Sequence, residues 1–319
     1  MKKWLLKFAL LLFCCFIGNL GKSQNNSDST KVGYTRAKIG LFFKNTFDFR
    51  NSFTKIRYTI SAKNSDSLIL PKTCRNMKRT FVDSFNFFDE TKWSKGQPWG
   101  NYHPAFLHQY YGNNQVYVKD GKLHLLNEYH PTTFNQNTKD SITIPYGTGL
   151  INSLNQKCFK YGYFAIRSKN PTGPATWPAF WLTGQKNWPP EIDIFEMYGK
   201  SNGEKIHRQT MTVHMGKTET RTKRMVVKSI NLPKDTDQKF HIYACHWEPK
   251  KITFYTDGIK VKTIKLNKWM RQFYQEPMYL ILNNALENKY IPQLISSGNK
   301  TSDFQVDWVQ VYQSPHLAN

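Results

Sequence analysis

The 319-residue sequence is short of acidic residues and shows hardly any helical periodicity. It has 22 Asp and Glu against 45 Lys and Arg, which gives a formal net charge of +23. A field of one sign attracts polyanions and speeds encounter with them. There is no internal repeat, no heptad and no Gly-rich phosphate loop, which argues against repeat arrays, coiled coils and P-loop nucleotide binding. No nucleic-acid recognition module accompanies the charge, so we expect no nucleic-acid partner.

Cysteine is also scarce. Five cysteines are present, and three of them, Cys74, Cys158 and Cys245, lie beyond the N-terminal apolar run. Their spacing matches no zinc motif, and an odd number cannot pair completely within one chain. One disulfide is compatible with the sequence, in any pairing. Cys245 lies in the apolar run "FHIYACHW", so we expect it to be a buried small hydrophobe.

A long apolar run occurs at the N-terminus alone and predicts an export signal rather than a stable membrane span. Two lysines precede "WLLKFALLLFCCFIG", and Gly21 and Ser23 suit a cut before Gln24. We therefore assign residues 1–23 to a signal peptide and expect an exported protein that is secreted, periplasmic or on the cell surface. The alternative, a lipid anchor after cleavage at Cys14 or Cys15, would put a bulky residue before the cut.

Loss of residues 1–23 removes four lysines and no acids, so the charge falls from +23 by 4 to +19. That remains strongly basic. The expected partner is a polysaccharide, including anionic ones, and the sequence says nothing about oligomeric state. A charge that serves solubility alone is equally compatible with the composition.

Short strand-like runs separated by turn residues predict an all-β fold. Aromatics make up 15% of the residues, and the alternating runs begin at "RTFVDSFNFFDETKW". In "VYVKDGKLHLL" and "ITFYTDGIKVKTI" an Asp-Gly pair separates two such runs, which predicts two tight hairpins. We expect a sandwich or jelly roll over residues 79–319, preceded by an N-terminal extension, residues 24–78, of unknown role.

The stretch "WPPEIDIFEMYG" (188–199) holds three acids at uneven spacing. On a helix Glu191, Asp193 and Glu196 would scatter around the axis. On a regular strand Glu191 and Asp193 share a face and Glu196 points away. One β-bulge within "DIFE" returns Glu196 to the first face. We therefore predict a bulged strand with three carboxylates on one surface.

Three carboxylates on one face repel one another, so at least one pKa should be raised and the group should titrate as a coupled set. An ionised carboxylate beside a protonated carboxyl is what retaining cleavage of a glycosidic bond requires. An acidic strand face paired with lysines would produce the same pattern of acids, and so would a calcium site.

These acids and their surroundings resemble glycoside hydrolase family 16. "EIDIFE" is similar to the bulged form of the family's E-x-D-x-x-E signature, and "KYGYFAIRSK", "TWPAFWLTG", "MTVHMG" and "PMYLILNNAL" follow the family's order. The likeness spans roughly residues 80–313. It implies a concanavalin A-like jelly-roll sandwich of two antiparallel sheets with a concave cleft. It also implies an endo-acting, retaining glycosidase that cleaves β-linked polysaccharide.

The resemblance also implies roles for particular residues. Glu191 would be the nucleophile, Asp193 the assisting acid and Glu196 the general acid/base. The residues expected to bind substrate are Trp177 and Trp181 as sugar-stacking indoles that share a face, Arg167 on the donor side, His214 beside Glu196, and Asn283 or Asn284 in the cleft.

No cofactor is required by this chemistry and no metal ligand is assigned to the site. Asp307 resembles the position of a structural calcium ligand in some relatives, although a surface aspartate accounts for it equally. Arg221 and Arg224 lie in a basic stretch after His214 and are candidates to hold sulfate or carboxylate groups. The substrate stays open between a β-galactan of the agar, porphyran or carrageenan type and a β-1,3/1,4-glucan. The alternative function is a lectin-like sandwich that binds glycans without cleaving them.

Overall fold

The computed structural model describes residues 68–103, 106–135, 141–199, 207–216, 222–232 and 236–316. All of them belong to one unit of the chain, Phe53–Asn319. The predicted signal peptide and residues 24–67 of the predicted extension lie outside the described residues, so both assignments stay predictions.

Two β-sheets make up the described part of the chain. The ten-stranded sheet has the order β16-β15-β14-β9-β18-β5-β6-β3, with β1 beside β18 and β4 beside β5. The eight-stranded sheet has the order β13-β12-β11-β10-β17-β7-β2, with β8 beside β17. The strands are β1 Lys78–Asp83, β2 Ser94–Lys95, β3 Gln109–Tyr111, β4 Val116–Lys119, β5 Lys122–Asn135, β6 Ser141–Thr148, β7 Leu150–Asn152, β8 Cys158–Phe159, β9 Gly162–Lys169, β10 Thr176–Gly184, β11 Glu191–Met197, β12 Arg208–Gly216, β13 Thr222–Asn231, β14 His241–Glu248, β15 Lys251–Thr256, β16 Ile259–Lys265, β17 Met278–Leu286 and β18 Ser302–Gln313.

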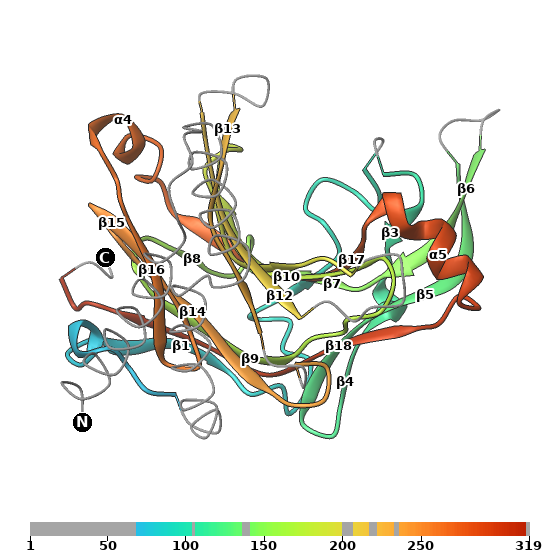
Figure 1. The fold of residues 1–319 in the computed structure, drawn as a ribbon, viewed down its shortest axis with the longest axis horizontal. Helices are drawn as coiled ribbons and strands as arrows, with labels where there is room; N and C mark the ends of the chain where they lie inside the picture. The colour runs from blue at the N-terminus through green and yellow to red at the C-terminus, as the bar shows by residue number, and fades with distance from the viewer. Residues whose placement is uncertain are drawn as a thin grey trace, which may run out of the picture. The chain divides into compact units, whose positions relative to one another are not determined.

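The two sheets face each other as the layers of a sandwich, which confirms the predicted fold class. In Figure 1 strands β14, β9 and β18 form the lower layer, and strands β12, β10 and β17 form the upper one. The paired strands run antiparallel, except that β3 pairs with β6 in parallel, which the sequence did not predict.

Alternating residues of both sheets fill the space between the layers. On β9, Phe164 and Ile166 point into this core, whereas Tyr163 and Ala165 lie on the outer face. On β10, Phe180 and Leu182 enter the core from the other sheet. Full burial of one such side chain stabilises the fold by about 1.5–3 kcal/mol, so the core holds both sheets in place and leaves their outer faces free for other roles.

Both predicted hairpins are confirmed. Strands β4 and β5 are joined by Asp120 and Gly121, and strands β15 and β16 by Asp257 and Gly258. All four residues have positive φ, as a type I′ turn requires.

Part of the predicted extension packs on the outer face of the ten-stranded sheet. Leu68, Leu70 and Met77 contact a cluster that includes Cys74 and Tyr163. Among the described residues Cys74, Cys158 and Cys245 are free thiols, so none of the allowed disulfides forms between them. Cys245 is fully buried, as predicted.

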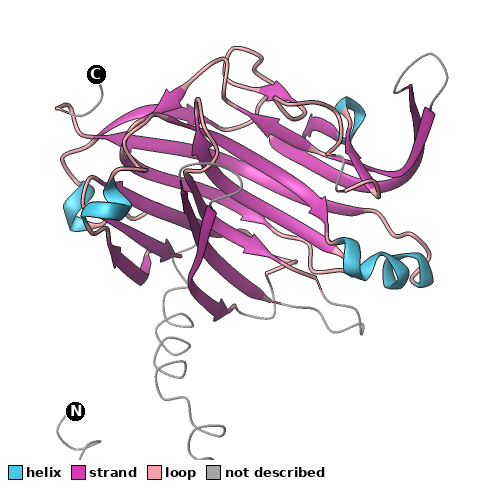
Figure 2. Ribbon diagram, turned by 90° about the horizontal axis from the view of Figure 1, so that it is seen from above, coloured by secondary structure: helices cyan, strands magenta, loops and turns pink. Residues whose placement is uncertain are grey.

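Helices are few among the described residues and lie at the margins of the strands (Figure 2). They are η2 Lys72–Cys74, η3 Asn113–Gln115, α4 Lys268–Arg271, η5 Asn288–Tyr290 and α5 Ile291–Ser296. Within the described ranges, none has the length and apolar character that crossing a membrane would take.

Candidate active site

Strand β11 carries the predicted bulge. Against β12, Asp193 pairs with Thr212 and Glu196 with Thr210, so three residue steps on β11 oppose two on β12. Ile194 and Phe195, although consecutive, are both buried in the core. This leaves Glu191, Asp193 and Glu196 together on the other face of the sheet, where all three line one cleft.

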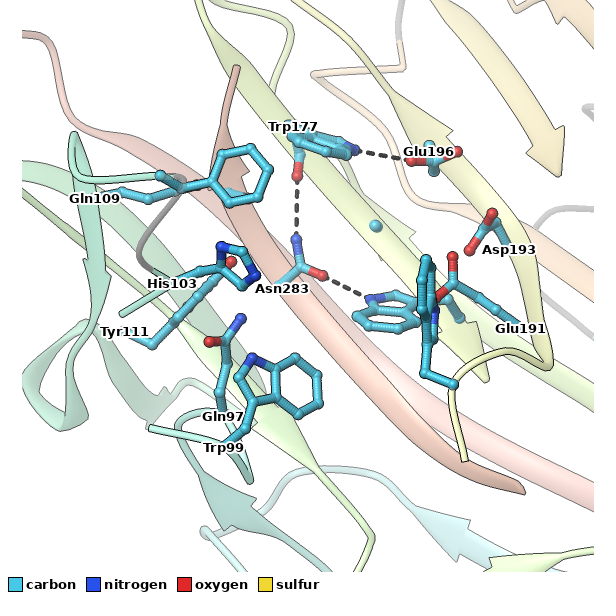
Figure 3. A pocket seen from close by; sticks show the side chains of 15 residues that line it. Gln97, Trp99, His103, Gln109, Tyr111, Trp177, Glu191, Asp193, Glu196 and Asn283 are labelled. Carbon is cyan, nitrogen blue, oxygen red and sulfur yellow. Dashed lines mark hydrogen bonds between the residues drawn. The ribbon is translucent and has the colours of Figure 1, made fainter. Parts of the chain in front are cut away.

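The cleft has a volume of about 270 Å³ and lies over β10, β11 and β17. Its lining residues are Gln97, Trp99, His103, Phe106, Gln109, Tyr111, Trp177, Ala179, Trp181, Trp188, Glu191, Asp193, Glu196, Asn283 and Ala285. In Figure 3, Gln97, Trp99 and His103 lie across the cleft from the three acids. A substrate would therefore lie between an acidic side and an aromatic one.

Both carboxylate oxygens of Glu191 have a polar neighbour. Trp188 Nε1 donates to Oε2 at 2.7 Å, and His214 Nε2 lies 3.2 Å from Oε1. The Tyr274 hydroxyl donates to the carbonyl oxygen of His214 at 2.8 Å, which fixes the strand that carries the imidazole. These groups can stabilise an anion on Glu191 and hold its orientation.

Burial raises the pKa of both Glu191 and Asp193. Burial is the first cause for Glu191, followed by the negative charge of Asp193, while His214 and the Trp188 hydrogen bond oppose the rise in pKa. The pKa of Asp193 is raised by burial and then by the charge of Glu196, while a hydrogen bond with Glu191 and the charge of Arg224 oppose it. Asp193 is only 3% exposed, and its Oδ2 atom has no hydrogen bond, although His214 Nε2 lies 3.4 Å from it. The predicted mutual perturbation of the acids is therefore present, and Asp193 is the member best placed to keep a proton.

Glu196 lies among donors from three neighbouring elements. Trp177 Nε1 and the Tyr198 hydroxyl donate to Oε1 at 3.2 and 2.5 Å, and the Thr212 hydroxyl donates to Oε2 at 3.1 Å. Arg224, on β13 two strands from β11, is half-exposed and reaches to 3.8 Å from Oε2. Its placement beside an acid of the cleft supports the prediction that it meets substrate groups. Arg221 lies outside the described residues.

The two predicted indoles do share a face. Trp177 and Trp181 both line the cleft, with Ala179 between them. Trp181 Nε1 donates to Asn283 Oδ1 at 2.8 Å, and Asn283 Nδ2 donates to the Trp177 carbonyl at 3.3 Å. Asn283 is thus the cleft asparagine, because Asn284 is fully buried and donates to Leu125 and Ser302 instead.

The prediction for Arg167 is wrong in its location. Phe164 and Ile166 point into the core, so Arg167 falls on the outer face of the ten-stranded sheet, away from the cleft. There its guanidinium pairs with Asp307 at 2.6 Å and lies over the Phe240 ring. The same ion pair accounts for Asp307, which the sequence had offered as a calcium ligand.

His214 is in the site, but not beside Glu196 as predicted. The register of β11 and β12 sets His214 opposite Glu191, and the bulge then brings Thr210 opposite Glu196. The imidazole therefore contacts Glu191 and Asp193, and the Thr212 hydroxyl donates to Glu196.

One donor set within the described residues could hold a metal ion. Glu191, Asp193 and His214 each offer a ligand atom, and these atoms lie within 4.8 Å of one another. Calcium takes six to eight oxygen ligands, so two carboxylates with an imidazole suit it poorly. The two raised carboxyl pKa values and the Trp188 hydrogen bond fit an acid–base site better.

Several cleft residues were not found from the sequence. Trp188 stands three residues before Glu191 and could have been found from that proximity. Gln97, Trp99 and His103 lie in the loop "GQPWGNYH", which has no periodicity and no local link to the acids. The contacts of Thr212 and Tyr198 with Glu196 depend on strand register and on the position of the Glu196 carboxyl, which the sequence alone does not give.

The raised carboxyl pKa values predict that Asp193→Asn stabilises the protein above pH 4. The ordinary pKa values of these carboxyls in an unfolded chain are 3.8 for Asp193 and 4.5 for Glu191, and both are raised in the fold. Once pH rises past the ordinary values, the folded protein therefore binds more protons than the unfolded chain, and the free energy of unfolding falls as pH rises. The substitution removes one of these groups. We expect Tm to exceed the parent's by a margin that grows from pH 4 to pH 8, at roughly 2–4 °C per kcal/mol gained. Calorimetry across that range measures it.

Asp89→Asn is the matched control. Hydrogen bonds from Thr91 and Lys92 lower the pKa of Asp89, so its stabilising contribution is present above the ordinary value and disappears as pH falls. The Asp89→Asn substitution should therefore lower Tm at pH 8 or leave it unchanged. An Asp193→Asn protein whose Tm is lower than the parent's at pH 8 would contradict the account of the buried pair.

Comparison with known proteins finds a matching family model and similar relatives. A family model described as "Beta-porphyranase A-D, GH16 domain" matches residues 76–314. Glucan endo-1,3-beta-glucosidase A1 of Niallia circulans is 27% identical over 268 residues, and keratan-sulfate endo-1,4-beta-galactosidase of Sphingobacterium multivorum is 26% identical over 258. Each alignment covers 74% of this chain, which spans 38% of the first relative's length and 55% of the second's.

A solved structure from Bacteroides ovatus, described as a mixed-linkage glucan GH16 protein in complex with a product, superposes with a TM-score of 0.59 at 26% identity. The superposition covers 72% of this chain and 99% of that one. The jelly-roll sandwich is therefore shared with solved relatives.

Proposed function

This chain belongs to glycoside hydrolase family 16, and from that premise we propose that it is a retaining endo-β-glycanase acting on an anionic β-galactan of the porphyran type. The observation that carries the proposal is the bulge of β11, which brings Glu191, Asp193 and Glu196 to one face within one cleft.

The geometry supports a double displacement. In the first step Glu196 gives its proton to the glycosidic oxygen while the Glu191 carboxylate attacks the anomeric carbon, so the bond to the leaving sugar breaks and a glycosyl ester forms. In the second step Glu196 takes a proton from water, and the water oxygen displaces Glu191. Two inversions return the β configuration.

The neighbours of the acids suit these roles. Trp188 and His214 contact the Glu191 carboxylate, which must be ionised to attack. The same two groups would stabilise the carboxylate again when the ester is cleaved and releases it. Asp193, with its raised pKa, can donate a hydrogen bond to Glu191 and share one negative charge with it.

Sugar rings would lie on the aromatic side chains of the cleft. Indoles present flat apolar faces to the C–H faces of pyranose rings. Trp99 is 50% exposed and Trp188 is 39% exposed, whereas Trp93 and Trp247 are fully buried in the core. Exposed indoles facing a cleft favour a bound glycan over a packing role.

Charge supports an anionic substrate. The whole chain carries +23, and Arg224 brings an exposed guanidinium to within 3.8 Å of Glu196. Arginine is suited to bidentate recognition of sulfate and carboxylate groups. The family model's description names porphyranases, and the relative from Sphingobacterium multivorum is named for keratan sulfate.

Arg224→Gln should lower kcat/KM on porphyran by about 10–100-fold, the value of one lost charge-assisted hydrogen bond. The effect on neutral agarose should be smaller, and the decline of porphyran cleavage with added salt should become shallower. Reducing-end assays at several ionic strengths measure both. Lys260→Gln removes the same charge from the ten-stranded sheet and should change neither activity. Equal losses on both polymers would count against substrate recognition by Arg224.

A reducing-end assay over porphyran, agarose, carrageenan, keratan sulfate, laminarin and lichenan tests the function itself. We expect the highest kcat/KM on porphyran. A preference for laminarin or lichenan would contradict the proposed substrate class but would agree with the proposed reaction. Binding to a polymer without release of reducing ends would favour the lectin-like alternative.

The proposed substrate is a polymer that cannot enter a cell, which agrees with export through the signal peptide 1–23. N-terminal sequencing of the secreted protein should begin at Gln24. A retained N-terminus, or a lipid on Cys14 or Cys15, would overturn the proposed cut.

A further inference from the structure

The hydrogen bonds around Glu196 distinguish its two carboxyl oxygens. Oε1 accepts from Trp177 Nε1 and from the Tyr198 hydroxyl. Oε2 accepts from the Thr212 hydroxyl, with the Arg224 guanidinium beyond it. Both oxygens therefore have partners, but the partners differ in what they can do when the carboxyl gains a proton.

The partners of Oε1 act as donors. An indole N–H can only donate. The Tyr198 hydroxyl donates to the same oxygen at 2.5 Å, and it would have to turn away beside a fixed indole donor for Oε1 to carry a proton. Burial first, and then the negative charge of Glu196, raise the pKa of Tyr198 far above the working range. Tyr198 is thus neutral, and its short bond to Oε1 competes with any proton on that atom.

The partner of Oε2 can reverse. A threonine hydroxyl both donates and accepts, so Thr212 can donate to an ionised Oε2 and accept from a protonated one. Arg224 lies 3.8 Å from Oε2, beyond hydrogen-bond distance, so a proton on Oε2 requires only Thr212 to turn, whereas a proton on Oε1 would meet the fixed indole donor of Trp177.

We propose that Tyr198 is a positioning residue for proton transfer, and that with Trp177 it fixes Oε1 as the acceptor and so places the transferable proton of Glu196 on Oε2. This inference rests on the proposed function, because it assigns an atom to the general acid. Tyr198 touches neither the reacting carbon nor the leaving oxygen and acts through the Glu196 carboxyl.

The local fold holds Tyr198 in this position. It follows Glu196 by two residues, so both side chains lie on the same face as β11 ends. Its ring packs against the Trp177 ring with centroids 5.2 Å apart. The next residue, Gly199, donates its N–H to the Thr176 carbonyl, and a Cβ there would collide with the Gly173 carbonyl oxygen. The glycine lets the chain approach closely enough to bring Tyr198 over Trp177.

The test uses Tyr198→Phe, which keeps the ring and removes the hydroxyl. Two substrates are compared: porphyran, whose leaving sugar needs a proton, and the 2,4-dinitrophenyl β-glycoside of the disaccharide released from it, whose leaving phenolate does not. We expect kcat on porphyran to fall about 10-fold with KM within twofold, which is the size of one hydrogen bond to a charged group. We expect kcat/KM on the aryl glycoside to stay within twofold of the parent.

Companion variants separate positioning from folding. Thr212→Ser keeps the reversible hydroxyl and should retain porphyran activity, whereas Thr212→Val should lose it and keep the aryl glycoside reaction. Tyr117→Phe removes a phenol from the exposed strand β4 and should match the parent on both substrates. Equal losses by Tyr198→Phe on both substrates, or no loss on either, would overturn the inference. A parent protein that cleaves neither substrate would instead refute the proposed function.

Discussion

Replacement of Glu191 by glutamine should reduce kcat on the polysaccharide by about 10⁴-fold or more while the fold stays intact. The amide cannot form the glycosyl ester, so the double displacement has no first step. Because burial and Asp193 raise the pKa of Glu191, loss of its charge also relieves repulsion in the cleft. Tm at pH 7 should therefore equal or exceed the parent's. Steady-state kinetics and calorimetry on one preparation measure both quantities.

Glu90→Gln is the matched control, since Glu90 is exposed at a distance from the cleft and its replacement should leave kcat unchanged. Turnover by Glu191→Gln within tenfold of the parent would remove Glu191 from the nucleophile's role. A fall in Tm of many degrees would show that the carboxylate serves the fold instead.

Replacement of Glu196 by alanine should produce a loss that depends on the leaving group. On the polysaccharide, where the leaving oxygen needs a proton, kcat should fall by about 10²–10⁴-fold, the usual contribution of general acid–base catalysis. On a 2,4-dinitrophenyl glycoside the first step needs no proton, so the glycosyl ester should accumulate and give a burst of phenolate. Azide, which needs no general base, should then restore turnover.

The configuration of the azide product makes this result specific. If the Glu191 ester is attacked by azide from the face that Glu196 occupies, the product is a β-glycosyl azide. Proton NMR of the isolated product distinguishes the two anomers. An α-azide, or a loss of equal size on both substrates without rescue, would contradict the acid/base role of Glu196.

The bulge on β11 was predictable because its evidence is local. Three acids at i, i+2 and i+5 can share a strand face only when one residue is added, and the apolar residues between them require a core on the other side. The same period placed Trp177 and Trp181 together, and Asp-Gly pairs marked the hairpins at 120–121 and 257–258. In each case a few neighbouring residues carry the whole signal.

Contacts between distant segments were not predictable in this way. Arg167 was placed in the cleft by likeness to a family strand. Side chains alternate along β9, and because Phe164 and Ile166 point into the core, Arg167 lies on the outer face of the ten-stranded sheet. His214 was placed beside Glu196, yet strand register sets it opposite Glu191. The cleft residues at 97–111 lie 80 to 99 residues before the acids along the chain, and no pattern in their loop predicts that they face the acids.

The most direct measurement is mass spectrometry of the protein after reaction with a 2-deoxy-2-fluoro-β-glycoside that has a dinitrophenyl leaving group. The fluorine slows breakdown of the ester more than its formation, so the trapped sugar marks the nucleophile. We expect one label per chain, on the peptide that contains Glu191, and none in the Glu191→Gln protein. A label on Asp193 or Glu196, or no label while the polysaccharide is still cleaved, would contradict this expectation.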